Sequence, residues 1–225
     1  MLRTIVLDCD GVIADTEPLH LAAFRSVLDA EGITLTEDDY YSRYLALDDR
    51  HCFLQVYADR ERPLPESELQ SLLRRKGENF EPVLRAKLRI FPGVVDFVRL
   101  AAERYPLAIA SGAVRHEVEA ILAHGDIRGC FQELVCAGDT ARGKPHPDPF
   151  LRALALLNAA EAQPIQPAEC LVIEDSIPGI QAALDAGMRS LAVCNSYSRE
   201  QLRRADLVRD SLVGLSIEEL ERLFD

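Results

Sequence analysis

The sequence Ile5-Val6-Leu7-Asp8-Cys9-Asp10-Gly11-Val12 runs from a purely apolar segment directly into two carboxylates and a glycine. A strand that is covered on both faces needs no polar alternation, so residues 5–7 predict a buried strand of a parallel sheet. Residues two apart on an extended chain project the same way, and Gly11 permits a sharp turn. The segment therefore predicts a strand after which Asp8 and Asp10 face one cavity.

Four further apolar runs predict the other strands of this sheet, and helical patterns lie between the runs. The predicted strands span 107–110, 134–137, 171–173 and 191–194. The predicted helices span 94–103, 114–123, 149–157 and 177–186. Because strand and helix alternate, we expect an α/β fold with a Rossmann-like, doubly wound parallel sheet.

The alternation breaks once, after the first strand. Residues from about 17 to about 88 contain only helical patterns, such as 18–30 and 66–87, over a span too long for a simple crossover. Asp15-Thr16-Glu17-Pro18 offers a capping side chain and a proline in the first turn of a helix. We therefore expect a helical domain, residues 16–88, inserted into a core made of residues 1–15 and 89–225.

Chemically useful side chains follow the predicted strands, where ligands bind in open parallel sheets. Ser111-Gly112 follows the second strand, Gly143-Lys144-Pro145 follows the third by a short loop, and Glu174-Asp175-Ser176 follows the fourth. We expect these groups to meet Asp8 and Asp10 at one edge of the sheet. Ser111 is also expected to cap the helix that follows it.

So many acids can share a site only if a cation neutralises them, and an oxygen-rich set without histidine favours Mg²⁺. One ligand set would be Asp8, Asp175 and the backbone carbonyl of Asp10. Lys144, the Ser111 hydroxyl and the amides around Gly112 offer donors to a phosphate. A carboxylate placed among these groups can attack phosphorus, and a second can protonate the leaving oxygen.

These motifs resemble the four signature motifs of the haloacid dehalogenase superfamily over essentially the whole chain. They are Asp8-x-Asp10-Gly11-Val12-x-x-Asp15-Thr16, Ser111, Gly143-Lys144-Pro145 and Glu174-Asp175-Ser176-x-x-Gly179-x-x-Ala182-Ala183-x-x-Ala186-Gly187-Met188. The helical insert resembles the cap of the branch that contains β-phosphoglucomutase and phosphoglycolate phosphatase. The second aspartate of the pair sets the chain apart from the dehalogenase branch.

The resemblance implies a role for each motif residue. Asp8 is the expected nucleophile and Asp10 the expected general acid and base. Ser111, Gly112 and Lys144 are expected to bind the phosphoryl group. Mg²⁺ is the implied cofactor, with Asp8, Asp10, Glu174 and Asp175 as its expected ligands, and either Glu174 or Asp175 can contact the ion directly while the other acts through water.

The inserted domain holds four further candidates, each of which competes with a structural interpretation. His20 and Lys76 match positions where relatives place a histidine and a substrate-facing lysine, but both could be exposed polar residues of amphipathic helices. Arg50 lies in a segment where relatives bind the far end of the substrate, and Ala46 replaces a frequent glycine. Glu17 could line the pocket or stabilise a helix start.

The composition excludes several other classes of function. The 225 residues carry 37 acidic and 25 basic side chains, a formal net charge of −12, so nucleic acid is not expected as a partner. We expect no signal peptide and no membrane span, and hence a cytoplasmic protein. The six cysteines lie far apart and are expected to be reduced.

Together these features predict an enzyme that hydrolyses a small phosphorylated metabolite through an aspartyl-phosphate. A sugar-phosphate mutase would use the same core residues and differ in shielding the intermediate from water. A phospho-aspartate signalling module is a third possibility, although such domains are about half this length and have no cap. The expected oligomeric state is a monomer or a weak homodimer.

Overall fold

The computed structural model describes residues 1–45, 47–159 and 162–225, so Ala46 lies outside the described residues. The described chain forms two compact units. The α/β unit consists of Met1–Asp15 and Arg89–Asp225, and the helical unit consists of Thr16–Leu88. None of the helices in the described part of the chain combines the length and the apolar character that a bilayer span requires.

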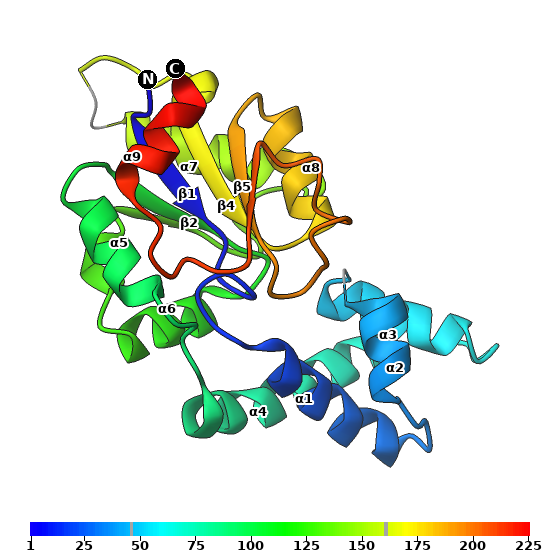
Figure 1. Ribbon diagram of the computed structural model, residues 1–225. Coiled ribbons are helices and arrows are strands. Elements are labelled where there is room, and N and C mark those ends of the chain that lie inside the picture. Colours follow the sequence, from blue (N-terminus) through cyan, green and yellow to red (C-terminus); the bar gives the residue numbers. More distant parts are fainter. Residues whose placement is uncertain (46, 160–161) are drawn as a thin grey trace. The chain divides into compact units, whose positions relative to one another are not determined.

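The α/β unit is built on a parallel sheet with the strand order β3-β2-β1-β4-β5-β6 (Figure 1). Its strands are β1 (Thr4–Leu7), β2 (Leu107–Ala110), β3 (Glu133–Val135), β4 (Cys170–Glu174), β5 (Arg189–Val193) and β6 (Leu207–Arg209). The first five correspond to the predicted apolar runs, although β3 ends two residues earlier than expected. The sequence analysis missed β6, which is short, half-buried and flanked by charged residues.

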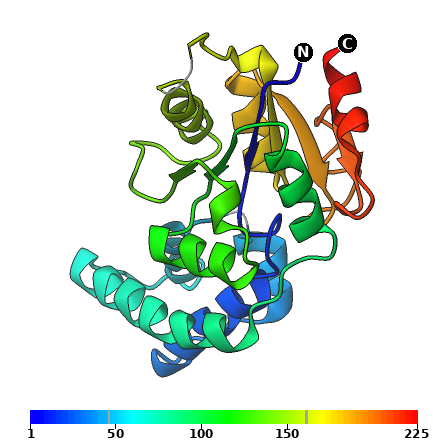
Figure 2. The same cartoon turned by 90° about the vertical axis from the view of Figure 1, so that its left-hand side faces the viewer.

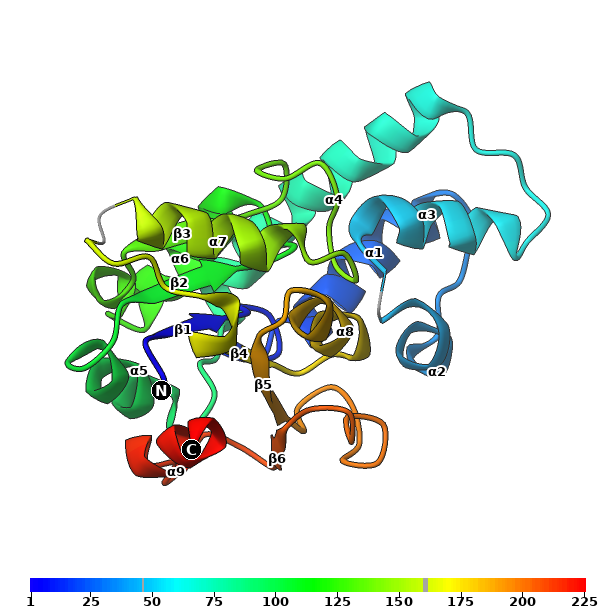
Figure 3. The same cartoon turned by 90° about the horizontal axis from the view of Figure 1, so that it is seen from above.

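Helices cover both faces of this sheet. The helices α7 (Asp148–Asn158) and α8 (Ile177–Asp185) pack on one face, and α5 (Val94–Ala102) and α9 (Ile217–Glu221) lie on the other (Figures 2 and 3). The unit also contains α6 (Arg115–His124) and 3₁₀ turns at Arg128–Cys130, Pro167–Glu169 and Arg222–Phe224. With apolar layers on both sides, the strands can be free of polar residues.

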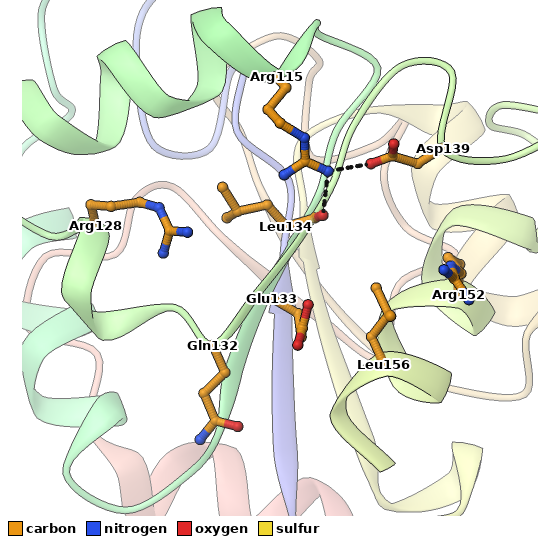
Figure 4. A pocket seen from close by; sticks show the side chains of 8 residues that line it. All are labelled: Arg115, Arg128, Gln132, Glu133, Leu134, Asp139, Arg152 and Leu156. Carbon is orange, nitrogen blue, oxygen red and sulfur yellow. Dashed lines mark hydrogen bonds and ion pairs between the residues drawn. The ribbon is translucent and has the colours of Figure 1, made fainter. Parts of the chain in front are cut away.

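The two outer strands have their exposed edges capped by arginines. Val135 accepts a hydrogen bond from the amide of Ser111, so the preceding carbonyl, that of Leu134, turns outward. Arg115 donates to that carbonyl at 3.1 Å (Figure 4), and Arg199 donates to the carbonyl of Val208 in β6 at 2.7 Å. Each guanidinium also forms an ion pair with an aspartate. Such contacts occupy acceptors that would otherwise pair with another strand.

The helical unit contains α1 (Glu17–Ala30), α2 (Glu37–Asp39), a π-helical turn (Tyr40–Tyr44), α3 (Asp49–Ala58) and α4 (Glu66–Lys87). The helices α1 and α4 lie side by side, and α3 also packs against α4. A separate hydrophobic core, with Phe24, Phe53 and Leu69 among its buried members, holds the unit together. Thr16 precedes α1 as predicted, but its side chain makes no capping hydrogen bond, so that part of the prediction was wrong.

Candidate active site

The parallel strands bring the motif residues to one edge of the sheet. Asp8 directly follows β1, Ser111 directly follows β2, and Glu174 is the last residue of β4. The amide of Asp8 donates to the carbonyl of Ile173 at 3.0 Å, which fixes the first motif beside the fourth. Residues separated by more than 160 positions in the sequence thus share one site.

Lys144 lies between two buried carboxylates. Its ammonium is 3.0 Å from Oδ1 of Asp8 and 2.5 Å from Oε1 of Glu174. It also lies 5.0 Å from the centre of the Phe150 ring. Burial alone would lower the pKa of Lys144, but the charges of Asp8 and Glu174 outweigh it and raise this pKa above its ordinary value. Lys144 is therefore a fixed positive charge facing Asp8.

Asp8 is in an unusual electrostatic environment. Burial raises the pKa of its carboxyl from 3.8 to about 7, although Lys144 acts in the opposite direction, and the charges of Glu174 and Asp10 raise the pKa further. Its Oδ1 is buried and has no hydrogen-bond partner of good geometry among the described residues. This oxygen meets the Lys144 ammonium at 3.0 Å without good hydrogen-bond geometry, so it can accept a further partner.

Glu174 is held by several donors. Its Oε2 accepts hydrogen bonds from the amides of Asp175 and Ser176, both at 3.0 Å, and from the Ser176 hydroxyl at 2.9 Å. Ser176 also caps α8, because its Oγ accepts from the amide of Gly179 at 3.1 Å. Both Glu174 oxygens are therefore engaged, one by the start of α8 and one by Lys144.

Three of the acids could hold a metal ion. One oxygen each from Asp8, Glu174 and Asp175 lie within 4.8 Å of one another, and all three residues are buried. Three carboxylates with a single buried ammonium leave an excess of negative charge, which suits a hard divalent cation. Oδ1 of Asp8, which makes no hydrogen bond of good geometry to the described residues, can contact the same ion.

Ser111 and Gly112 occupy the turn after β2. The Ser111 hydroxyl accepts from the amide of Ala113 at 3.0 Å and lies 3.4 Å from Oδ2 of Asp10. The residue that precedes α6 is Val114, so the expectation that Ser111 caps this helix was wrong. A Ser turn of this kind orders the backbone locally, and it leaves the exposed Gly112 at the same edge of the sheet.

In the helical unit, Lys76 and His20 form one polar cluster. The Lys76 side chain is only 1% exposed, so the interpretation of an exposed lysine was wrong. Its ammonium lies 2.7 Å from Nδ1 of His20 and 2.8 Å from Oδ2 of Asp49. It also lies over the rings of Phe24 and Phe80, and His20 stacks on Phe80.

The other two candidates of the helical unit are engaged by neighbouring side chains. Both terminal nitrogens of Arg50 donate to Glu66 at 2.8 Å in a two-pronged pair. Hydrogen bonds from Arg50 lower the pKa of Glu66 from 4.5 to about 2. Oε2 of Glu17 accepts from the hydroxyl of Tyr40 at 2.7 Å.

A cavity of about 310 Å³ in the α/β unit lies away from the motif residues (Figure 4). It is lined by Arg115, Arg128, Gln132, Glu133, Leu134, Asp139, Arg152 and Leu156. None of the predicted site residues lines it, so the chemistry of the motifs has no part there.

The sequence analysis missed two polar residues that contact the motifs. Asn195 and Ser196 lie in the turn after β5. Asn195 donates to the carbonyl of Gly11, and Ser196 donates to Oδ2 of Asp175. The position of polar residues just after a strand is the same signal that selected the other candidates, so it could have identified these two.

Comparison with known proteins places the chain in a family. The family model described as haloacid dehalogenase-like hydrolase matches residues 2–187. The chain therefore belongs to the haloacid dehalogenase-like hydrolases, as the motifs predicted.

The relatives within this family include phosphatases and a phosphoglucomutase. Fructose-1-phosphate phosphatase YqaB of Escherichia coli is 33% identical over 84% of this chain and 95% of its own length. Beta-phosphoglucomutase of Bacillus subtilis is 30% identical over 96% of this chain and 94% of its own. The crystal structure of CbbY from Rhodobacter sphaeroides in complex with phosphate superimposes with a TM-score of 0.86 at 25% identity, and covers 98% of this chain and 100% of that one. The chain is thus an enzyme, a phosphatase or a closely related phosphomutase.

Proposed function

We propose that this enzyme is a Mg²⁺-dependent phosphohydrolase that cleaves small phosphorylated sugars through an aspartyl-phosphate at Asp8. One observation carries the proposal. The buried Asp8 carboxylate lies within a cluster of three acids, and its Oδ1 is 3.0 Å from the Lys144 ammonium without a hydrogen bond of good geometry to the described residues. A carboxylate in this position can act as a nucleophile toward phosphorus when the substrate and the cation are bound.

Asp8, Asp175 and the backbone carbonyl of Asp10 would hold the metal ion. Glu174 joins them directly only if its Oε1 exchanges the Lys144 ammonium for the ion, because its Oε2 is saturated by donors of α8. When bound, Mg²⁺ offsets the repulsion between the Asp8 carboxylate and the phosphate oxygens. Lys144 binds the transferring phosphoryl group through its ammonium, and Ser111 and the Gly112 amide offer further donors.

Asp10 is the proposed general acid and base. It lies two residues beyond Asp8, and its Oδ2 is 3.4 Å from the Ser111 hydroxyl. In its protonated form it would donate a proton to the leaving alcohol. The same carboxylate would then accept a proton from the water that hydrolyses the acyl phosphate.

The names of the relatives support one substrate class. Their printed names include a fructose-1-phosphate phosphatase and a phosphorylated carbohydrates phosphatase. We therefore infer a small sugar phosphate as substrate, and we assign the helical unit the role of a cap that selects it. Within that unit, Arg50, His20 and Lys76 are the proposed groups for the sugar.

Replacement of the nucleophile tests the proposal. Asp8→Asn should abolish phosphate release from a panel of sugar phosphates while circular dichroism shows an intact fold. Asp38→Asn, an exposed residue of the helical unit, is the matched control and should retain full activity. Removal of Mg²⁺ with EDTA should abolish activity and added Mg²⁺ should restore it. Near-normal activity of purified Asp8→Asn protein would defeat the assignment.

A phosphomutase is the alternative, and the buried Lys76–His20 pair favours it. The Lys76 ammonium and the His20 ring, 2.7 Å apart, could orient a second hydroxyl of a sugar if Lys76 exchanged its present contacts for the substrate. Incubation with glucose 1-phosphate and a bisphosphate activator separates the two activities. Release of free phosphate indicates a phosphatase, whereas an isomer without free phosphate indicates a mutase.

A further inference from the structure

The turn after β5 lies beside the fourth motif because of the sheet register. Ala192 of β5 pairs with Glu174 at the end of β4. The chain therefore leaves β5 next to Asp175, and Asn195 and Ser196 are the half-buried residues of the turn that follows.

Ser196 fixes one oxygen of Asp175. Its hydroxyl donates to Oδ2 of Asp175. On another side of this oxygen lies the backbone of Gly11, where an added Cβ would be only 1.9 Å from the same Oδ2. Because Oδ2 is enclosed by a hydroxyl and a backbone segment, the carboxylate cannot rotate freely about its side-chain torsion.

Asn195 fixes the first motif from the same turn. Its Nδ2 donates to the carbonyl of Gly11 at 2.7 Å, across 184 positions of sequence. Gly11 has a φ of 73°, a conformation that favours glycine, and it is the residue after Asp10. Two adjacent side chains thus hold the two chain segments that supply the acids.

We propose that Asn195 and Ser196 are positioning residues of the divalent-cation site, which hold the Gly11 turn and the Asp175 carboxylate in the arrangement that the ion needs. This inference rests on the proposed function, which assigns the ion to Asp8 and Asp175. Neither side chain reacts. Each of the two side chains holds a group in place before the ion binds, so that less conformational entropy is lost on binding.

Isothermal titration with Mg²⁺ alone tests the proposal without any substrate. Ser196→Ala should weaken Mg²⁺ binding by about 10–100-fold, the range found when outer partners of metal ligands are removed. Asn195→Ala should weaken it in the same direction, and Ser196→Thr, which keeps the hydroxyl, should restore the affinity. Ser198→Ala is the matched control, because the Ser198 hydroxyl bonds to Gln201 instead. Circular dichroism verifies that each variant is folded.

The dependence of the reaction rate on Mg²⁺ concentration distinguishes a positioning role from a catalytic role. In Ser196→Ala the Mg²⁺ concentration for half-maximal activity should rise, while the rate at saturating Mg²⁺ should stay near that of the wild type. An unchanged Mg²⁺ affinity in folded Ser196→Ala would overturn this inference and leave the proposed function intact. Weakened affinity in that variant, with no phosphate release by the wild-type enzyme from any ester, would support the inference and overturn the proposed function.

Discussion

Gly179 lies in the first turn of α8, directly against the carboxylate of Glu174. A Cβ at this position would be 1.9 Å from Cδ and from Oε1 of Glu174, where ordinary contact begins at 3.4 Å, so Gly179→Ala would displace the carboxylate by about 1.5 Å. The carboxylate would then leave the donors of Asp175 and Ser176 and its contact with Lys144.

The expected loss of unfolding free energy in Gly179→Ala is the difference between two effects. Alanine stabilises a helix interior by about 1 kcal/mol relative to glycine. Overpacking of a filled site costs about 1–3 kcal/mol, and loosening a buried ion pair adds to this cost. The two effects leave a net cost of up to about 2 kcal/mol, to which the loosened ion pair adds. At about 2–4 °C per kcal/mol for a unit of this size, we expect Gly179→Ala to lower the melting temperature by roughly 8 °C at the upper end of that cost. Because a shift of about 1 Å at a catalytic group can cost about 100-fold in rate, turnover of a sugar phosphate should fall by a similar factor.

Gly77→Ala provides the matched control. Gly77 lies inside α4, and an added Cβ there meets no atom within 4 Å. The same substitution should therefore raise the melting temperature of the protein. Thermal unfolding of both variants, followed by circular dichroism, measures the contrast. If Gly179→Ala were as stable and as active as the wild type, the tight contact between Gly179 and Glu174 would be refuted.

Three further predictions concern residues outside the motifs. Arg50→Ala should raise the pKa of Glu66 from about 2 toward 4.5, although the hydrogen bond from Gln70 remains. The stabilising effect of the Arg50–Glu66 pair is present above pH 4.5 and lost as the pH falls toward 2, so it should shrink in this variant. NMR titration of the carboxyl measures the pKa, and an unchanged value would contradict the prediction. Removal of both edge arginines, Arg115 and Arg199, should promote self-association, visible as a larger mass in light scattering than for either single variant. Lys76→Met should destabilise the helical unit, because it removes one partner of the ion pair with Asp49 and the hydrogen bond to His20. The cost should stay below the roughly 3–5 kcal/mol of a fully buried pair, since Asp49 is partly exposed, and thermal unfolding measures it. A large loss of sugar-phosphate turnover in variant protein that is still folded would show that Lys76 serves the substrate.

The sheet was predictable because its strands are covered on both faces. A buried parallel strand such as Leu107–Ala110 must be apolar throughout, and this requirement is visible in the sequence without knowledge of its neighbours. The strand β6 was not predicted, because it is not fully buried. It lies at the edge, has three half-buried residues, and includes Arg209, which forms an ion pair with Glu219. Its pairing with β5 depends on tertiary contacts that leave no apolar run.

The identity of the candidate site residues was predictable, but their connections were not. The order of strands and motifs predicts that Asp8, Lys144 and Asp175 meet at one edge of the sheet. It does not predict which oxygen of Glu174 binds the ammonium, because that depends on side-chain rotamers set by the start of α8. Nor does the pattern of α4 predict the burial of Lys76, since a lysine at that spacing is equally compatible with an exposed face.

The charges of the site explain why Glu174 is bound so tightly. Asp8, Glu174 and Asp175 bring three negative charges into a buried region, and Lys144 supplies one positive charge. The backbone amides and the hydroxyl at the start of α8 stabilise Glu174 without adding a formal charge. These acids outnumber the single ammonium, and the nearby charge of Asp10 adds to the excess, which suits a divalent cation. If the ion binds at Asp8 and Asp175, Lys144 is still held by Glu174 and keeps its position for the phosphoryl group, so the cation and the ammonium can act on the same substrate at once.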